Sequence, residues 1–203
     1  IFLLNIMNKY TIILLIIVAI YFSYYFYNNY YLGPIERCSQ KYNLDRIYEF
    51  KDLLNPQECN IIIEMAKPHL QKSTVMSKKM KHPGRTSSHV FLQTENNLLR
   101  KIDTMISNYL HIPPSHFEKL QVVNYKSTQK YDAHYDTCDP KDPICIDDTK
   151  RFGSLRFATF IIYLNDNFTG GETEFPKHNL KTKPKTGKAV LFFNLNDANN
   201  HRR

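Results

Sequence analysis

The 203-residue sequence contains no tryptophan and only six glycines, and it does not begin with methionine. It shows no internal repeat, and no low-complexity tract outside one apolar N-terminal stretch. The missing initial methionine argues against a complete chain, so we expect a fragment whose natural start is Met7. Fourteen tyrosines and thirteen phenylalanines fit a compact domain that is rich in strands or of mixed type. The length allows one such domain plus an appendage.

A strongly basic face is also missing. The net charge is +8 and the pI is about 9.2, but only 23% of the residues are charged, and both signs are mixed along most of the chain. We interpret this charge as a mild bias toward acidic partners. A basic run with Lys78, Lys79, Lys81 and Arg85 surrounds a Pro-Gly turn and is typical of a solvated loop. No base-stacking pocket is evident, so no nucleic-acid partner is expected.

Charged residues are absent from Tyr10 to Tyr27, where a run of Ile, Leu and Val is closed by Tyr and Phe. The run is about long enough to cross a hydrocarbon core, and its aromatic cluster lies where an interfacial belt would be. One alternative is a buried pair of strands, and another is a cleaved signal peptide, although no small-x-small cleavage site follows. We predict a membrane anchor over residues 1–27, with a single transmembrane helix of the signal-anchor type, and a linker over residues 28–46.

The side of the membrane is not fixed by charge, because Lys9 is the only charge before the apolar run and the residues after the run are mixed. The acceptor "NFT" at Asn167 suits a lumenal domain. Cys59 lies in a helical pattern and also fits an ordinary buried thiol. We expect a single-pass protein of the endoplasmic reticulum with a lumenal domain over residues 47–203. This location also suits the cysteines, which are Cys38, Cys59, Cys138 and Cys145.

Two helices are predicted before residue 111. Asn55 as N-cap, Pro56 at the first helical position and Glu58 at the third form the arrangement of a capping box. The apolar stripe of this first helix consists of Ile61, Ile62, Met65 and Ala66. A second helix runs from Thr94 until "HIPP" ends it, with a stripe of Leu98, Leu99, Ile102, Met105, Ile106, Tyr109 and Leu110. We expect both stripes to pack in the core.

After residue 117 the pattern changes from helix to strand. The runs "KLQVVNYK", "SLRFATFIIYLN", "GETEF" and "GKAVLFFNL" are rich in β-branched and aromatic residues and are separated by turn residues. Helices followed by a series of strands predict an α+β domain, in which the sheet curls or stacks on itself and the helices support one side.

The segment "KYDAHYD" places His134 and Asp136 two residues apart, after a predicted strand that ends near Tyr125. Side chains at i and i+2 of an extended chain point to the same side. An imidazole and a carboxylate so placed supply two ligands of the facial triad that holds non-haem Fe(II). The pair alone is a weak signal, because two polar residues on a loop would look the same. A third ligand should be a distant histidine on a neighbouring strand.

The stretch "YKSTQKYDAHYD" has a set spacing of Tyr, Gln, Tyr, His and Asp, and the strand-like runs "RFATFIIYLNDNFTGGETEFP" and "GKAVLFFNL" follow it. These motifs, in this order, resemble the prolyl 4-hydroxylase branch of the Fe(II)/2-oxoglutarate dioxygenases. The helix "LLNPQECNIIIEMAKPHLQKSTV" and the "RTSS" loop are similar to its N-terminal part. The resemblance covers residues 47 to about 195. It implies a double-stranded β-helix core, of the jelly-roll or cupin-like kind, with supporting N-terminal helices.

The resemblance also assigns roles to residues. It implies that His134 and Asp136 bind the iron, that the Tyr125 hydroxyl points at a carboxylate of 2-oxoglutarate, and that Thr159 lies near the same co-substrate. The family continues past the "FFNL" strand to a third iron ligand and a lysine for 2-oxoglutarate. In this sequence His201 is a poor match for that ligand, so we expect a C-terminally incomplete domain that is inactive as it stands.

The implied activity is that of an oxidoreductase similar to procollagen-proline 4-dioxygenase. Such an enzyme uses Fe(II), 2-oxoglutarate and O₂ to convert peptidyl proline to 4-hydroxyproline, and L-ascorbate restores iron that has been oxidised. The expected partner is a proline-rich or collagen-like peptide, and the loop from Ser73 to Arg85 is expected near its groove. The alternative is a catalytically inactive module that binds proline-rich peptides.

Overall fold

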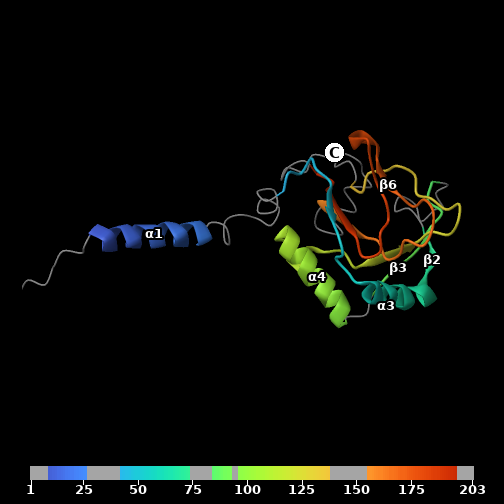
Figure 1. The fold of residues 1–203 in the computed structure, drawn as a ribbon, viewed down its shortest axis with the longest axis horizontal. Coiled ribbons are helices and arrows are strands. Elements are labelled where there is room, and N and C mark those ends of the chain that lie inside the picture. Colours follow the sequence, from blue (N-terminus) through green and yellow to red (C-terminus); the bar gives the residue numbers. More distant parts are fainter. Residues whose placement is uncertain (1–8, 27–41, 74–83, 93–95, 138–154, 196–203) are drawn as a thin grey trace, which may run out of the picture.

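The computed structural model describes residues 9–26, 42–73, 84–92, 96–137 and 155–195 (Figure 1). From residue 48 onward, the described residues form eight short strands, two longer helices and three short 3₁₀ helices. The elements are α1 (Lys9–Phe26), β1 (Tyr48–Phe50), α3 (Pro56–Ala66), η2 (Lys67–His69), β2 (Gln71–Lys72), β3 (Ser88–Phe91), α4 (Asn97–Leu110), η3 (Pro114–His116), β4 (Gln121–Asn124), β5 (Ala158–Ile162), β6 (Thr173–Phe175), η4 (Pro176–His178), β7 (Leu180–Thr182) and β8 (Ala189–Phe193).

Helix α1 corresponds to the apolar run, and large apolar side chains on it, such as Tyr10, Leu14 and Ile20, are exposed. It is 18 residues long, or about 27 Å at 1.5 Å per residue, and it begins at the charged Lys9. A hydrocarbon core requires roughly 20 predominantly apolar residues. Within the described ranges, none of the helices combines the length and the apolar character that crossing a membrane requires. The predicted transmembrane helix is therefore not shown by the described residues.

Helix α3 begins as predicted. The Asn55 side chain accepts a hydrogen bond of 2.9 Å from the main-chain N–H of Glu58, and the Glu58 carboxylate accepts one of 3.0 Å from the N–H of Asn55. Its buried stripe is Cys59, Ile62 and Ala66. The prediction that Ile61 packs in the core is wrong, because this side chain is 49% exposed. Adjacent helical positions differ by about 100° in direction, so Ile61 turns outward when Ile62 turns inward.

Helix α4 begins after Asn96, whose side chain accepts a hydrogen bond of 2.9 Å from the N–H of Leu99. It ends at His111, which adopts the left-handed conformation with φ of 56°. Ile102 and Leu110 are buried, in agreement with the predicted stripe. The helix therefore packs in the core as the sequence predicts.

The strands form antiparallel sheets. One three-stranded sheet has the order β1-β8-β5, another has the order β2-β3-β4, and β6 pairs with β7. The predicted runs contain β4, β5, β6 and β8, whereas β1, β2, β3 and β7 were not predicted. In the first sheet Thr159 of β5 is opposite Phe192 of β8. In the second sheet Ser88 of β3 is opposite Asn124 of β4.

Two hydrophobic clusters hold these layers together. One lies around β8 and contains Leu191, Phe193 and Leu195. The other joins α3 and α4 to the sheets, with Ile62 and Ile102 packed near Val122 of β4. Figure 1 shows both helices along one side of the strand region. The helices thus support the strands, as the predicted α+β class requires.

Gly187 joins three segments near the start of β8. Its carbonyl oxygen accepts hydrogen bonds from the N–H groups of Leu53, at 2.8 Å, and Leu54, at 3.3 Å, and its own N–H donates to the Tyr163 carbonyl oxygen at 2.8 Å. Its φ of +79° favours glycine, and a Cβ atom here would collide with the carbonyl oxygen of Leu54. Three segments therefore meet at the main chain of Gly187. They are the approach to α3, the end of β5 and the start of β8.

Candidate active site

The two predicted iron ligands lie together. Nε2 of His134 is 3.1 Å from Oδ1 of Asp136. Both residues follow β4 on a segment without regular secondary structure, so packing rather than a strand ladder orients them. The side chains meet on one side of the chain, which confirms the geometric expectation from their spacing. Their role as iron ligands stays a prediction.

The tautomer of His134 is fixed by its other ring nitrogen. Nδ1 lies 2.7 Å from the main-chain carbonyl oxygen of Asp132, and a carbonyl oxygen only accepts hydrogen bonds, so Nδ1 carries the hydrogen. In a neutral ring, Nε2 then has a lone pair that faces the Asp136 carboxylate. Two lone pairs at this distance repel one another unless a cation lies between them. The pair is therefore suited to share either a proton or a metal ion.

The electrostatics agree with this arrangement. The hydrogen bond to Asp136 raises the pKa of His134, although burial opposes protonation. Burial disfavours the charged form of Asp136, but hydrogen bonds from His134 and Thr159 and the positive charge of Arg156 outweigh it and lower the pKa of this carboxyl. Asp136 is thus held as an anion, the state in which a carboxylate binds a metal.

A stack of side chains covers one face of the imidazole. The rings of Tyr131 and His134 are stacked, with centroids 3.6 Å apart and planes at 21°. The Arg85 guanidinium lies 4.7 Å from the Tyr131 ring centroid. Main-chain contacts fix this pairing, because Arg85 and Tyr131 form a β-bridge and the N–H of Asp132 donates to the Gly84 carbonyl oxygen at 2.8 Å. The segment before β3 therefore holds the segment that carries His134.

Arg156 fixes the backbone of the second ligand. Its Nη1 donates to the main-chain carbonyl oxygen of Asp136 at 2.7 Å. Nε and Nη2 of the same guanidinium donate to the two carboxylate oxygens of Glu118, at 2.6 and 2.8 Å. Such bidentate pairs are geometrically specific. Neither contact was predicted, because the three residues are far apart along the chain.

Thr159 also contacts Asp136. Its Oγ1 donates to Oδ2 of the carboxylate at 2.7 Å. Oγ1 of Thr159 also accepts a hydrogen bond of 2.9 Å from Nδ2 of Asn194. Asn194 is only 6% exposed. Thr159 thus lies at the site, in contact with the predicted iron ligand. Its predicted proximity to 2-oxoglutarate stays a prediction.

Tyr125 is at the end of a series of hydrogen bonds between polar side chains. It follows β4, remains 47% exposed, and forms a side-chain hydrogen bond with Ser87. Desolvation of its hydroxyl raises the pKa of Tyr125. Ser87 Oγ donates to Ser73 Oγ at 3.0 Å, and Ser73 Oγ lies 3.0 Å from Nδ1 of His89. The hydroxyl is therefore anchored by Ser87, the residue before β3, and the expected role in binding 2-oxoglutarate is untested.

The side chains present fit two positions of a facial triad. A neutral imidazole nitrogen and an ionised carboxylate converge, and both are ligands that Fe(II) accepts. Over the described ranges, which stop at residue 195, no set of three or more His, Cys, Asp or Glu side chains is placed to hold a metal ion. The candidate His201 lies outside these ranges, as do residues 74–83 of the predicted substrate loop.

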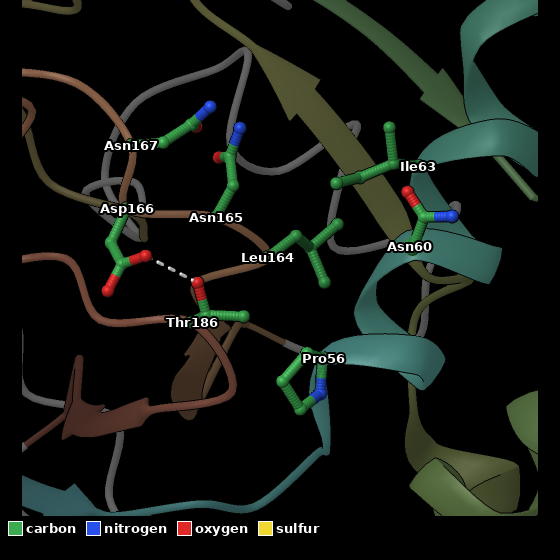
Figure 2. A pocket seen from close by; sticks show the side chains of 8 residues that line it. All are labelled: Pro56, Asn60, Ile63, Leu164, Asn165, Asp166, Asn167 and Thr186. Carbon is green, nitrogen blue, oxygen red and sulfur yellow. Dashed lines mark hydrogen bonds between the residues drawn. The ribbon is translucent and has the colours of Figure 1, made fainter.

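A separate hollow of about 290 Å³ opens between α3 and the loop after β5 (Figure 2). Its polar lining includes Asn60, Asn165 and Asn167, and the last of these is the exposed asparagine of the predicted glycosylation acceptor. The Asp166 carboxylate accepts a hydrogen bond of 2.7 Å from Thr186 Oγ1 and pairs with Lys185. The hollow shares no lining residue with the ligand pair, so it is not part of the candidate active site.

Comparison with known proteins shows which family the chain is related to. The model of the 2OG-Fe(II) oxygenase superfamily matches residues 120–203. The chain is 36% identical over 171 residues to probable prolyl 4-hydroxylase 10 of Arabidopsis thaliana, covering 72% of this chain and 57% of that protein. It is 36% identical over 162 residues to a putative prolyl 4-hydroxylase of Acanthamoeba polyphaga mimivirus, covering 78% and 65%. The chain belongs to the prolyl 4-hydroxylase family.

A solved viral collagen prolyl hydroxylase has a similar fold. The viral collagen prolyl hydroxylase from Paramecium bursaria Chlorella virus-1, determined with 2OG, superimposes with a TM-score of 0.58 at 25% identity, covering 77% of this chain and 81% of that one. The chain therefore has a 2OG-Fe(II) oxygenase fold of mixed helix and sheet content. It spans 57% to 65% of the length of the two prolyl 4-hydroxylases compared above.

Proposed function

We propose that this protein is an Fe(II)- and 2-oxoglutarate-dependent dioxygenase that converts peptidyl proline to 4-hydroxyproline in a proline-rich or collagen-like protein. The observation that carries the proposal is the His134–Asp136 pair. Its tautomer and ionisation leave a lone pair and an anion facing one another at 3.1 Å. The names of the relatives support the substrate class, since they are prolyl 4-hydroxylases and a collagen prolyl hydroxylase.

In this proposal His134 Nε2 and the Asp136 carboxylate hold Fe(II), and the Tyr125 hydroxyl binds a carboxylate of 2-oxoglutarate. When bound, the iron supplies the O₂ activation that couples decarboxylation of 2-oxoglutarate to hydroxylation of a proline ring carbon. L-ascorbate is proposed to restore iron that has been oxidised. The antiparallel sheets β1-β8-β5 and β2-β3-β4 support a distorted double-stranded β-helix as the scaffold.

The chain's own residues orient the ligands. Asp132 fixes the imidazole tautomer, Tyr131 stacks on the ring, and Arg156 holds the backbone of Asp136. Such outer contacts set ligand orientation and basicity, and their loss typically costs about 10- to 100-fold in metal affinity or activity. A site held in this way suits a metal that must keep positions open on one face for its co-substrates.

The test uses the full-length protein and its His134→Ala and Asp136→Ala variants. Co(II) binding is measured by titration calorimetry, and succinate formation from 2-oxoglutarate is measured with a proline-rich peptide. We expect both variants to lose Co(II) binding and succinate formation, while His116→Ala, which removes an exposed histidine on η3, behaves like the wild type. Unimpaired turnover by His134→Ala would sink the assignment. Peptide binding by the wild type without metal binding or turnover would instead identify a peptide-binding module.

A further inference from the structure

We propose that Thr159 and Asn194 are positioning residues that hold the Asp136 carboxylate for the metal, and that Thr159 does not bind 2-oxoglutarate directly. This inference rests on the metal-binding part of the proposed function. It begins with the hydrogen bond of 2.7 Å from Thr159 Oγ1 to Asp136 Oδ2 and the hydrogen bond of 2.9 Å from Asn194 Nδ2 to the same hydroxyl oxygen.

The direction of each hydrogen bond follows from valence. An ionised carboxylate has only acceptor sites, so the single hydroxyl proton of Thr159 must point at Asp136. The hydroxyl can then only accept from Asn194, which requires the NH₂ group of the amide, not its oxygen, to face Thr159. The two hydrogen bonds therefore run in one direction: Asn194 donates to Thr159, and Thr159 donates to Asp136.

The sheet places these residues on one face. Thr159 on β5 is opposite Phe192 on β8, and Asn194 follows two residues later, so its side chain lies on the same side as that of Phe192. The Asn194 N–H also donates to the Phe157 carbonyl oxygen at 2.7 Å. Asn194 is 6% exposed, so its amide is largely shielded from water. It is thus fixed by both backbone and burial.

The direction of these hydrogen bonds has a chemical consequence for the co-substrate. The carboxylates of 2-oxoglutarate are acceptors, and the hydroxyl proton of Thr159 is already used by Asp136. Thr159 could donate to 2-oxoglutarate only by releasing the proposed iron ligand. The hydrogen bond to Oδ2 instead leaves Oδ1, the oxygen that faces His134 Nε2, directed at the metal position. Asn194 acts only through Thr159, by removing the rotational freedom of its hydroxyl.

The experiment is a double-mutant cycle in the full chain with Thr159→Val, Asn194→Ala and the double variant. The Co(II) dissociation constant is measured by titration calorimetry, and folding is checked by thermal unfolding. We expect Thr159→Val to weaken Co(II) binding by about 10-fold or more, and Asn194→Ala by a few-fold. The double variant should bind no more weakly than Thr159→Val alone, since among the described residues Asn194 reaches Asp136 through Thr159.

Two further variants separate positioning from general stability. Thr159→Ser keeps the hydroxyl and should bind Co(II) like the wild type. Thr182→Val breaks a hydrogen bond of the same length, 2.7 Å, between a buried threonine and the Glu49 carboxylate, so it should lower stability without changing Co(II) affinity. The 2-oxoglutarate dissociation constant at saturating Co(II) should not change in Thr159→Val.

The outcomes distinguish this inference from the proposed function. Wild-type Co(II) binding with an unchanged affinity in Thr159→Val overturns the inference alone, as does a loss of 2-oxoglutarate affinity at unchanged Co(II) affinity. Equal effects of Asn194→Ala in the wild type and in the Thr159→Val background also overturn it, because they would show that Asn194 acts independently. A wild-type chain that binds no Co(II) overturns both.

Discussion

The ring of Tyr131 is stacked on the imidazole of His134, with ring centroids 3.6 Å apart. Arg85 lies at the same tyrosine, 4.7 Å from its ring centroid. Ring stacking restricts the orientation of the imidazole without using either of its nitrogens. Nε2 therefore stays directed at Asp136, while Nδ1 remains engaged by Asp132.

The first prediction follows from this stack. Tyr131→Ala should weaken Co(II) binding by about 2- to 10-fold, because an aromatic pair contributes about 0.5–1.5 kcal/mol beyond its burial. Titration calorimetry measures the change. Tyr131→Phe keeps the ring and should retain wild-type affinity. Wild-type affinity in Tyr131→Ala would show that the remaining contacts suffice to orient His134.

The second prediction concerns Gly187. Gly187→Ala should lower the free energy of unfolding by at least about 2 kcal/mol, because the left-handed backbone costs about 1–2 kcal/mol for a residue with a Cβ and the added atom would also collide with Leu54. Denaturant unfolding measures this loss. Gly170→Ala is the matched control, since Gly170 also has positive φ but its Cβ would meet only Glu172 at an ordinary 3.9 Å. Equal losses in the two variants would show that the collision is relieved.

The third prediction is a pH dependence at Asp166. The hydrogen bond from Thr186, together with Lys185, lowers the pKa of Asp166 from 3.8 to about 2. A carboxyl with a lowered pKa in the folded state adds stability above its unfolded pKa, and this stability disappears as the pH falls from about 4 toward 2. Asp166→Asn should therefore lower the melting temperature at pH 6, and the difference should shrink as the pH approaches 3.

Thermal unfolding of both proteins between pH 6 and pH 3 tests this dependence. Thr186→Val removes the leading hydrogen bond and should reproduce part of the effect of Asp166→Asn at pH 6. A melting-temperature difference that is constant over the whole pH range would contradict the prediction, because it would show that the charge of Asp166 is not responsible.

The local signals in the sequence predicted local structure well. The capping box at Asn55 and the helical spacing of Ile102 and Leu110 depend on neighbours a few residues away, and the structure contains both. The meeting of His134 and Asp136 likewise agrees with their i, i+2 spacing, although long-range packing completes their orientation. Each of these features joins residues within one short segment.

Features that depend on distant pairing were not predicted. Strand β3 is a short segment, "SHVF", that is stabilised by β2 and β4 rather than by strong strand propensity. The pairing of Arg156 with Glu118 and the contact of Asn194 with Thr159 arise only when the sheets assemble. The exposure of Ile61 was not predicted for the same reason. The elements that pack against α3 decide which of its side chains face the core.

The contacts of Asp136 also have a consequence for biosynthesis. The carboxylate accepts a hydrogen bond from Thr159 on β5, and Thr159 accepts one from Asn194. Asn194 follows β8, the central strand of the β1-β8-β5 sheet. A growing polypeptide therefore presents His134 and Asp136 well before the segment that secures them has been translated. Long-range strand pairing is slow, because loop closure precedes the contacts that compensate for it. If His134 and Asp136 bind the metal as proposed, metal capture is expected to be a late event in maturation that follows closure of the sheet.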